Sequence, residues 1–393
     1  MAGKWNDQIA IIGTGCTRFG ERFTTSWADL AVEAANEACQ AAGVSLADIE
    51  AAWVGSFRPN IAGERSTGSP LAEALGFTDK PVTLVSNICA TGLDALRNAC
   101  LGVASGLYDI ALAIGVEKMR DSGTRSLSLA NRTDGHPLVG KGRTAPGFFA
   151  SCAHRYFHTY GIGRETLAKV AVKNHHNGTL NPKAHLQREI TVDDVLRSPW
   201  VAEPLSVLDS TANSDGAAAA IVTRADIAKS LGRNYVLVSG IALAVGSERN
   251  IFDPDFDFLG FKPTQAAAQA AYRQAGIKDP RTEIDIAECH DCFTITEIIN
   301  YEDLGFAARG EGWKLIEEGV TSLSGSLPVN TDGGLKAFGH PLGASGLRMV
   351  YEVVKQLQGQ AGPRQVQNAR RGLVHTLGGP GALACVGILE RVD

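Results

Sequence analysis

The same order of local signals occurs twice along this 393-residue chain, and this repeat constrains the fold more than any other feature. Apolar stretches at 7–15 and 234–240 are typical of buried strands. Each is followed by a segment with apolar residues at helical spacing, 27–38 in the first case and the alanine-rich 264–275 in the second. Because one hydrophobic core supports about 250–300 residues, the repeat predicts two fused halves of similar fold.

The parallel between the halves continues beyond these helices. Ser26 and Thr264 are predicted N-caps, because hydroxyl side chains satisfy the free N–H groups at a helix start. Further strands are expected at 49–54 and 109–116 in the first half and at 284–289 and 372–377 in the second, with helices opening at 90–93 and 344–347. Each half therefore reads β-α-β-α-β, which predicts an α/β protein with two parallel sheets covered by helices.

The repeat is interrupted between residues 118 and 210. This segment holds six of the nine histidines and several prolines, and it shows no strand–helix alternation. It is interpreted as an insertion that lies over the first half and carries a binding surface or stabilises a dimer. The expected division is therefore a first half of 1–117 plus 211–232, an insertion of 118–210 and a second half of 233–393.

The composition is that of an ordinary soluble enzyme, with 44% hydrophobic and 20% charged residues. A net charge of −5 argues against a nucleic-acid-binding surface, which usually carries a basic excess. No apolar run approaches the roughly 18 residues of a membrane span, and no signal peptide is evident. We therefore expect a cytoplasmic protein whose eight cysteines are reduced, without a membrane or nucleic-acid partner.

Cys89 is the first candidate for chemistry. An apolar stretch at 82–85 leads into a turn of small residues, and a helix pattern begins directly after it. A thiol at a helix N-terminus lies near free N–H groups and the positive end of the helix dipole, which favour a thiolate. A cysteine packed among small core residues is the alternative interpretation.

His340 is the second candidate. It lies between Gly339 and Pro341, directly before a helix start, in a stretch with an unusual density of glycine. Such glycines indicate close approach of backbone or ligand, although a purely structural histidine remains an alternative.

Two further segments follow strands of the second half. Residues 288–293 contain a Cys-x-x-Cys pair, Cys289 and Cys292, but no second pair of ligands, so a zinc or redox interpretation is weak. Residues 375–381 form a glycine loop whose N–H groups could stabilise an oxyanion, and the loop lacks the Gly-Lys-Ser/Thr ending of a phosphate loop. In α/β proteins, active and binding sites are often formed by strand ends and turns such as these. No metal site is predicted.

Taken together, these four elements resemble the thiolase family, and most closely its sterol-carrier-protein-type and archaeal-type members. The resemblance runs through nearly the whole chain and includes three further segments, 115–119, 173–175 and 213–218. It implies the thiolase fold, in which two similar halves form a five-layered α-β-α-β-α core with a loop-domain insertion.

The resemblance also implies roles for individual residues. Cys89 matches the cysteine that takes the acyl group, and His340 the histidine that activates it. Thr376 stands where many thiolases have an acid/base cysteine, and Cys292 of the His-Asp-Cys-Phe motif is expected to replace it. The implied oxyanion-hole donors are the side chains of His290 and His340 and the backbone of Cys89 and Gly378, and the implied substrate-binding residues are Phe293 and Thr211.

The expected activity is cleavage or formation of a 3-ketoacyl-CoA through a thioester on the cysteine. Coenzyme A and acyl-CoA would be substrates, and no permanently bound cofactor is expected. The alternatives are a ketoacyl synthase, a retro-aldolase acting on steroid acyl-CoA, and a non-catalytic acyl-CoA-binding subunit. The resemblance further implies a homodimer or higher oligomer, paired through the strand at 82–85, and a small zinc-ribbon and OB-fold accessory subunit.

Overall fold

The computed structural model describes residues 8–57, 68–121, 144–247 and 255–392. Nine strands form one mixed sheet in the order β3-β2-β4-β7-β1-β8-β11-β10-β9. The first half supplies β1 (Ile9–Cys16), β2 (Ala51–Gly55), β3 (Val82–Val85), β4 (Ile110–Glu117) and β7 (Gly216–Arg224). The second half supplies β8 (Val236–Val245), β9 (Ile286–Glu288), β10 (Arg371–Gly378) and β11 (Leu383–Arg391). The halves join where β1 pairs with β8 at only two positions.

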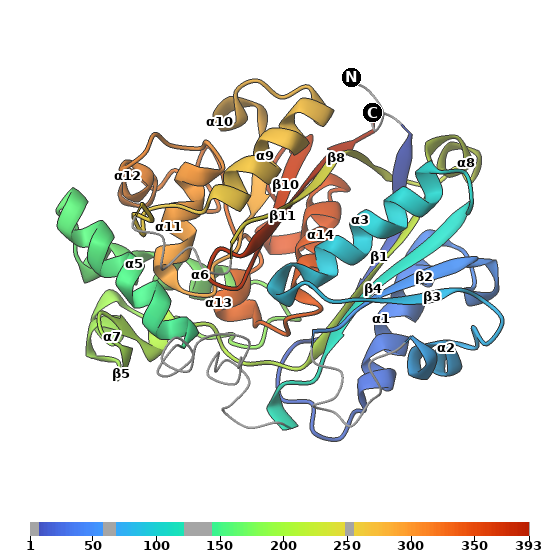
Figure 1. The fold of residues 1–393 in the computed structure, drawn as a ribbon, viewed down its shortest axis with the longest axis horizontal. Helices are drawn as coiled ribbons and strands as arrows, with labels where there is room; N and C mark the ends of the chain where they lie inside the picture. Colours follow the sequence, from blue (N-terminus) through green and yellow to red (C-terminus); the bar gives the residue numbers. More distant parts are fainter. Residues whose placement is uncertain (1–7, 58–67, 122–143, 248–254, 393) are drawn as a thin grey trace.

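Four helices show the layered arrangement (Figure 1). α1 (Trp27–Ala42) covers β1, β4 and β7 on one outer side, and α9 (Lys262–Ala275) covers β8 and β11 on the other. α3 (Thr91–Ala104) and α14 (Ser345–Leu357) contact each other and strands of both halves, so they form the middle layer. In order, the layers are α1, the strands of the first half, α3 with α14, the strands of the second half, and α9. The five layers of the thiolase fold are therefore confirmed.

Small residues allow the two middle helices to approach closely. A Cβ atom on Gly92 would lie 2.5 Å from the carbonyl oxygen of Gly343, and one on Gly346 would lie 2.5 Å from the backbone nitrogen of Leu93. Real Cβ atoms do not approach other atoms so closely. The glycine density near His340 is thus explained in part by backbone packing between the two helix N-termini.

The prediction of two parallel sheets is wrong. β7 runs antiparallel to β1 and β4, and β11 runs antiparallel to β8 and β10. β10 and β11 are joined by a tight hairpin in which Gly379 and Gly381 adopt positive φ angles of 61° and 71°. A short hairpin can only join antiparallel neighbours, whereas a parallel pair needs a long crossover.

The cap of the first helix is confirmed and that of the second is wrong. The Ser26 hydroxyl accepts a hydrogen bond from the Asp29 backbone at 3.0 Å, as an N-cap should. The helix expected to start at Thr264 begins instead at Lys262, where Pro263 fits the first turn. The Thr264 hydroxyl is buried and lies 3.1 Å from Nε2 of His375.

The described helices of the insertion pack mainly on the second half, whereas the sequence predicts a position over the first half. Its helices α5 (Ala145–Tyr160) and α6 (Arg164–Thr179) contact α11 (Thr294–Asp303), and α6 also contacts α12 (Gly312–Glu317) and α13 (Gly334–Phe338). A buried hydrogen bond from the Tyr156 hydroxyl to Glu302 fixes this contact.

The insertion also contains α7 (Val192–Arg197), β5 (Trp200–Ala202) and β6 (Leu205–Ser206), and the two halves contain the short helices α2 (Ser69–Leu75), α8 (Ala225–Ser230) and α10 (Pro280–Glu283). Among the described residues, no helix is long and apolar enough to cross a membrane.

Candidate active site

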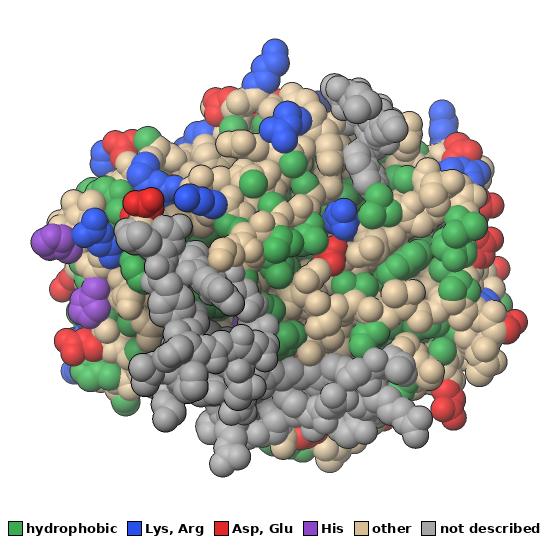
Figure 2. Space-filling view, in the orientation of Figure 1, with side chains coloured by type: hydrophobic (Ala, Val, Ile, Leu, Met, Phe, Trp, Pro, Cys, Tyr) green, Lys and Arg blue, Asp and Glu red, His purple; other side chains and the backbone are tan. Residues whose placement is uncertain are grey.

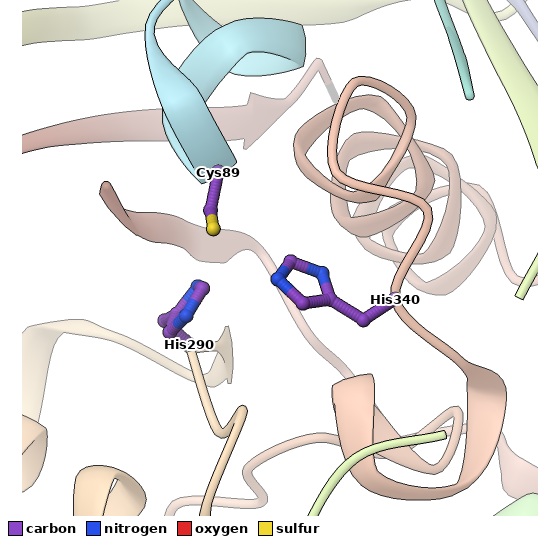
Figure 3. A group of neighbouring side chains, drawn as sticks. All are labelled: Cys89, His290 and His340. Carbon is purple, nitrogen blue, oxygen red and sulfur yellow. The ribbon is translucent and has the colours of Figure 1, made fainter. Parts of the chain in front are cut away.

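Three side chains from distant parts of the chain meet between the two halves (Figure 3). The sulfur of Cys89 and one ring nitrogen each of His290 and His340 all lie within 4.8 Å of one another. The two imidazole rings meet edge to face, with centroids 5.3 Å apart and planes at 82°. The structure therefore brings together three of the four side chains for which the sequence predicts catalytic roles.

The internal repeat explains why Cys89 and His340 face each other. In the first half, β3 leads through a turn carrying Cys89 into α3. In the second half, Val329 forms a parallel bridge to Ala287 in β9, and the chain continues through His340 into α14. The two residues thus precede the two middle helices at comparable places in the repeat. Ile88, directly before the cysteine, adopts a positive φ of 48°, which is a strained conformation for a branched side chain.

His340 is held as a neutral base. Its Nδ1 lies 2.7 Å from the hydroxyl of Ser345, and that hydroxyl donates its single proton to the carbonyl of Pro341 at 2.9 Å. The hydroxyl oxygen must then accept from Nδ1–H, which leaves the lone pair on Nε2. Burial, aided by the charge of Arg348, lowers the pKa of His340 to about 3. Nε2 is buried and has no hydrogen-bond partner among the described residues.

Cys89 is a thiol at rest and not a thiolate. Burial raises the pKa of its sulfhydryl to about 12, although a hydrogen bond from the backbone N–H of Gly379 acts in the opposite direction. Desolvation of a charged sulfur therefore opposes the effect of the helix N-terminus, which favours a thiolate. A base must remove the proton as the sulfur attacks, and the free Nε2 of His340 is suited to that task.

His290 is fixed through its backbone. Its N–H donates to Nδ1 of His375 at 3.4 Å, and its carbonyl accepts from the Asn300 side chain at 2.7 Å. Burial and the neighbouring His340 hold the pKa of His290 well below its usual value, so the ring is neutral. The next residue, Asp291, accepts hydrogen bonds from the backbone of Leu335 at 2.6 Å and so ties this segment to α13.

Cys292 lies near this group but outside the cluster of three. Burial raises the pKa of its thiol well above the usual value. Its sulfur lies 3.9 Å from the hydroxyl of Thr296, and its carbonyl accepts from the backbone of Thr211 at 3.0 Å. Phe293 follows, with its ring centroid 5.1 Å from that of Phe149. Both residues predicted to bind substrate are thus adjacent to Cys292.

The glycine loop contributes a residue that the sequence analysis missed. Gly378 was the predicted oxyanion donor, and it lies at the end of β10 beside Asn87, whose carbonyl oxygen would be 3.1 Å from an added Cβ. The N–H that reaches the Cys89 sulfur, however, belongs to Gly379. The Thr376 hydroxyl is buried without a partner among the described residues.

Comparison with known proteins identifies the family of the chain. The family model for the thiolase N-terminal domain matches residues 9–226, and that for the thiolase C-terminal domain matches residues 245–391. The chain belongs to the thiolase family. It is 41% identical over 384 residues to the acetyl-CoA acetyltransferase of Methanothermobacter thermautotrophicus, covering 98% of this chain and 99% of that one.

Two further relatives define the subgroup. Sterol carrier protein 2 of Gallus gallus is 35% identical over 96% of this thiolase-family chain and 70% of its own length. The solved structure of the Ltp2-ChsH2(DUF35) aldolase superposes with a TM-score of 0.82 at 27% identity, covering 98% of both chains. The resemblance to the sterol-carrier-protein-type and archaeal-type thiolases is confirmed by these matches.

Proposed function

We propose that this thiolase-family acyltransferase cleaves or forms a 3-ketoacyl-CoA through a thioester on Cys89. The observation that carries the proposal is the pairing of a half-buried thiol with a neutral imidazole whose free Nε2 faces it. The name of the archaeal acetyl-CoA acetyltransferase supports the same reaction type.

In the direction of cleavage, Nε2 of His340 takes the proton of Cys89 as the sulfur attacks the 3-keto carbon. The bond between the second and third carbons then breaks, its electron pair forms the enolate of the shorter thioester, and the acyl group stays on sulfur. Cys292 donates a proton to the enolate carbon and is left as a thiolate, which then takes the thiol proton of a second coenzyme A. The coenzyme A sulfur attacks the thioester and takes the acyl group, Cys89 leaves as a thiolate, and His340 returns its proton to the Cys89 sulfur.

Two negatively charged oxygens need hydrogen-bond donors in this sequence. We assign the enolate oxygen to the side chains of His290 and His340. The oxyanion formed on attack is assigned to the backbone N–H groups of Cys89 and Gly378. The N–H of Gly379, which already reaches the sulfur, serves either the thiolate or this oxyanion.

We also propose that the chain acts as a homodimer or higher oligomer and associates with a small accessory subunit. β3 forms one end of the nine-stranded sheet and so offers unpaired backbone groups to a second copy. The aldolase named above is a complex with a DUF35 protein, which supports a similar subunit here. The insertion also carries basic residues that could bind the phosphates of coenzyme A. Among them, Lys141 and Arg143 lie outside the described residues, and Lys173 donates hydrogen bonds to Glu297 and the carbonyl of Val329.

The proposal is tested by assaying coenzyme A-dependent cleavage of a panel of 3-ketoacyl-CoAs with short, branched and aromatic acyl groups. We expect turnover of at least one member by the wild-type chain, alone or with an added DUF35 protein, and none by Cys89→Ala. Equal turnover by the Cys89→Ala variant would contradict the proposal. Release of an aldehyde or ketone without any need for coenzyme A would indicate the retro-aldolase instead.

A further inference from the structure

The three side chains of the candidate active site also have the composition of a metal site. They offer one sulfur and two nitrogens, all within 4.8 Å of one another, and no other group of three metal-ligating side chains this compact occurs in the described parts of the chain. Nε2 of His340 is buried without a hydrogen-bond partner among the described residues. This nitrogen therefore has no interaction that a metal ion would have to break.

The distances are close to those that a tetrahedral zinc ion requires. Zinc binds sulfur at about 2.3 Å and imidazole nitrogen at about 2.0–2.1 Å, so neighbouring ligand atoms in a tetrahedron lie about 3.3–3.6 Å apart. Closing the cluster from at most 4.8 Å needs shifts of about 1 Å, which rotation of the side chains can supply.

The surroundings of the cluster act in both directions, because the carboxylate of Glu117 favours a cation while the charge of Arg348, which acts on both histidines, opposes one. The hydrogen bond from Nδ1 of His340 to Ser345 fixes the ring tautomer that presents Nε2, as outer-shell partners do in metal sites. Glu117, which is buried and accepts from the backbone of Gly343 at 2.9 Å, places a carboxylate close enough to act on Cys89. Three protein ligands leave a fourth tetrahedral position for water.

We propose that Cys89, His290 and His340 form a reversible, inhibitory binding site for Zn²⁺. Binding releases the thiol proton to solvent and forms one Zn–S and two Zn–N bonds, with no change of oxidation state. The inhibitory effect rests on the proposed function, because the same ion would occupy the nucleophile and its base together. The site is distinct from the Cys289-x-x-Cys292 pair, since Cys289 instead receives a hydrogen bond from Asn330 at 3.8 Å.

The test uses the full chain, stripped with a chelator and titrated with Zn²⁺ or Co²⁺. We expect one ion per chain and, with Co²⁺, the absorption band of a cobalt–thiolate bond. Cys89→Ser should lose the band and the bound ion, whereas the matched control Cys292→Ser should keep both. Ser345→Ala should bind about 10–100-fold more weakly, as is typical when an outer-shell partner is removed. Circular dichroism checks that each variant is folded.

Two outcomes would overturn the inference. One is the absence of stoichiometric metal binding to the folded wild-type chain. The other is binding that survives in Cys89→Ser and disappears in Cys292→Ser. Acylation of the metal-free protein is measured separately by mass spectrometry. An acyl adduct on Cys89 without metal binding would leave the proposed function intact and reject only the metal site.

Discussion

At the scale of single residues, the arrangement of proton donors and acceptors around His340 explains how the half-buried thiol of Cys89 can react. The Ser345 hydroxyl donates its proton to the carbonyl of Pro341. Its oxygen can therefore only accept a hydrogen bond from Nδ1–H of His340. Ser345 is a positioning residue, because it acts through the imidazole and not on the substrate. The sequence showed the histidine but not this partner, because the bond depends on how the turn between them folds.

Replacing Ser345 tests this arrangement. Ser345→Ala removes the acceptor for Nδ1–H, so both ring tautomers become populated and the base is only partly in its active form. We expect kcat to fall by about 10–100-fold with little change in KM, taking the range for outer-shell partners as a guide. Nitrogen NMR shifts of the His340 ring should move toward a tautomer mixture. Ser345→Thr, which keeps the hydroxyl, should retain both kcat and the wild-type spectrum; equal losses in both variants would argue for a packing role alone.

The choice between Cys292 and Thr376 as acid/base is a second residue-scale prediction. A threonine hydroxyl cannot take a proton from carbon near neutral pH, whereas a thiol can exchange one. Cys292→Ser should therefore lower the rate by about 10²–10⁴-fold, the usual contribution of a general acid or base. Thr376→Val, which matches the shape and removes the hydroxyl, should have a far smaller effect. Steady-state kinetics on one 3-ketoacyl-CoA would check this, and the reverse ranking would refute the assignment.

The residue motifs showed most of the candidate site because they lie at strand ends and helix starts that the periodicity identifies. Cys89, His290 and His340 meet as expected. Gly379 was missed, since which N–H of a glycine loop faces the sulfur depends on the register of the β10–β11 hairpin. The effect of burial on the pKa of Cys89 could not be predicted, because burial is a property of the folded chain and the sequence shows only the position at a helix start.

At the scale of elements, a buried ion network links the two segments that carry the histidines. Arg348 in α14 bonds to Glu288 at the end of β9 at 2.7 Å and to Asp332, in the turn before α13, at 2.6 and 2.7 Å. Glu288 precedes His290 by two residues, and the turn with Asp332 leads to His340. The guanidinium therefore fixes the positions of His290 and His340 relative to each other.

Arg348→Met should uncouple these elements. The variant leaves two buried carboxylates without their partner, which typically costs about 3–5 kcal/mol. The free energy of unfolding, measured in urea at fixed protein concentration, should fall by that amount. Arg224→Met removes ion pairs to Asp109 and Asp226 on the surface and serves as the control, with an expected change of about 0–1 kcal/mol. Equal stability of the two variants would contradict this role of the network.

The elements show where the sequence analysis reached its limit. The strands and helices with clear periodicity were located within a few residues, including β1, α1 and α3. β7, with its alanine-rich sequence, carries little strand signal and was not predicted, and β11 was not predicted either. Without these two strands the sheets appeared parallel. Their antiparallel direction follows from connections whose geometry the local sequence does not specify.

At the scale of the whole molecule, the edge of the sheet determines how copies of the chain can associate. Leu101 and Leu107, near the C-terminal end of α3, are 40% and 70% exposed. Hydrophobic side chains also gather on the face of the molecule where Figure 1 shows α3 and β3 (Figure 2). An open strand edge beside an apolar surface favours pairing with a second copy.

Light scattering tests the expected dimer. The wild-type chain at micromolar concentration should have about twice the mass of the 41.5 kDa monomer. Leu84→Arg places a charge on β3 and should shift the equilibrium to monomers, because a buried charge at an interface is costly. Val245→Arg, at an exposed position at the end of β8, is the matched control and should leave the dimer intact. A wild-type monomer would refute pairing through this edge.

The packing of the insertion belongs to the same scale and was not accessible from the sequence. Its contacts with α11, α12 and α13 depend on side chains more than a hundred residues apart, such as Tyr156 and Glu302. The sequence showed that the segment interrupts the repeat. It did not show which half would cover the apolar faces of α5 and α6.

The most direct test of the account is the location of the covalent acyl group. The metal-free chain is incubated with an acyl-CoA, quenched in acid, digested and examined by mass spectrometry. The account predicts an adduct of the acyl mass on the peptide that contains Cys89. In His340→Asn, which lacks the base, the same adduct should form much more slowly. An adduct found only on Cys292, or on no cysteine while the chain turns over its substrate, would contradict the central claim.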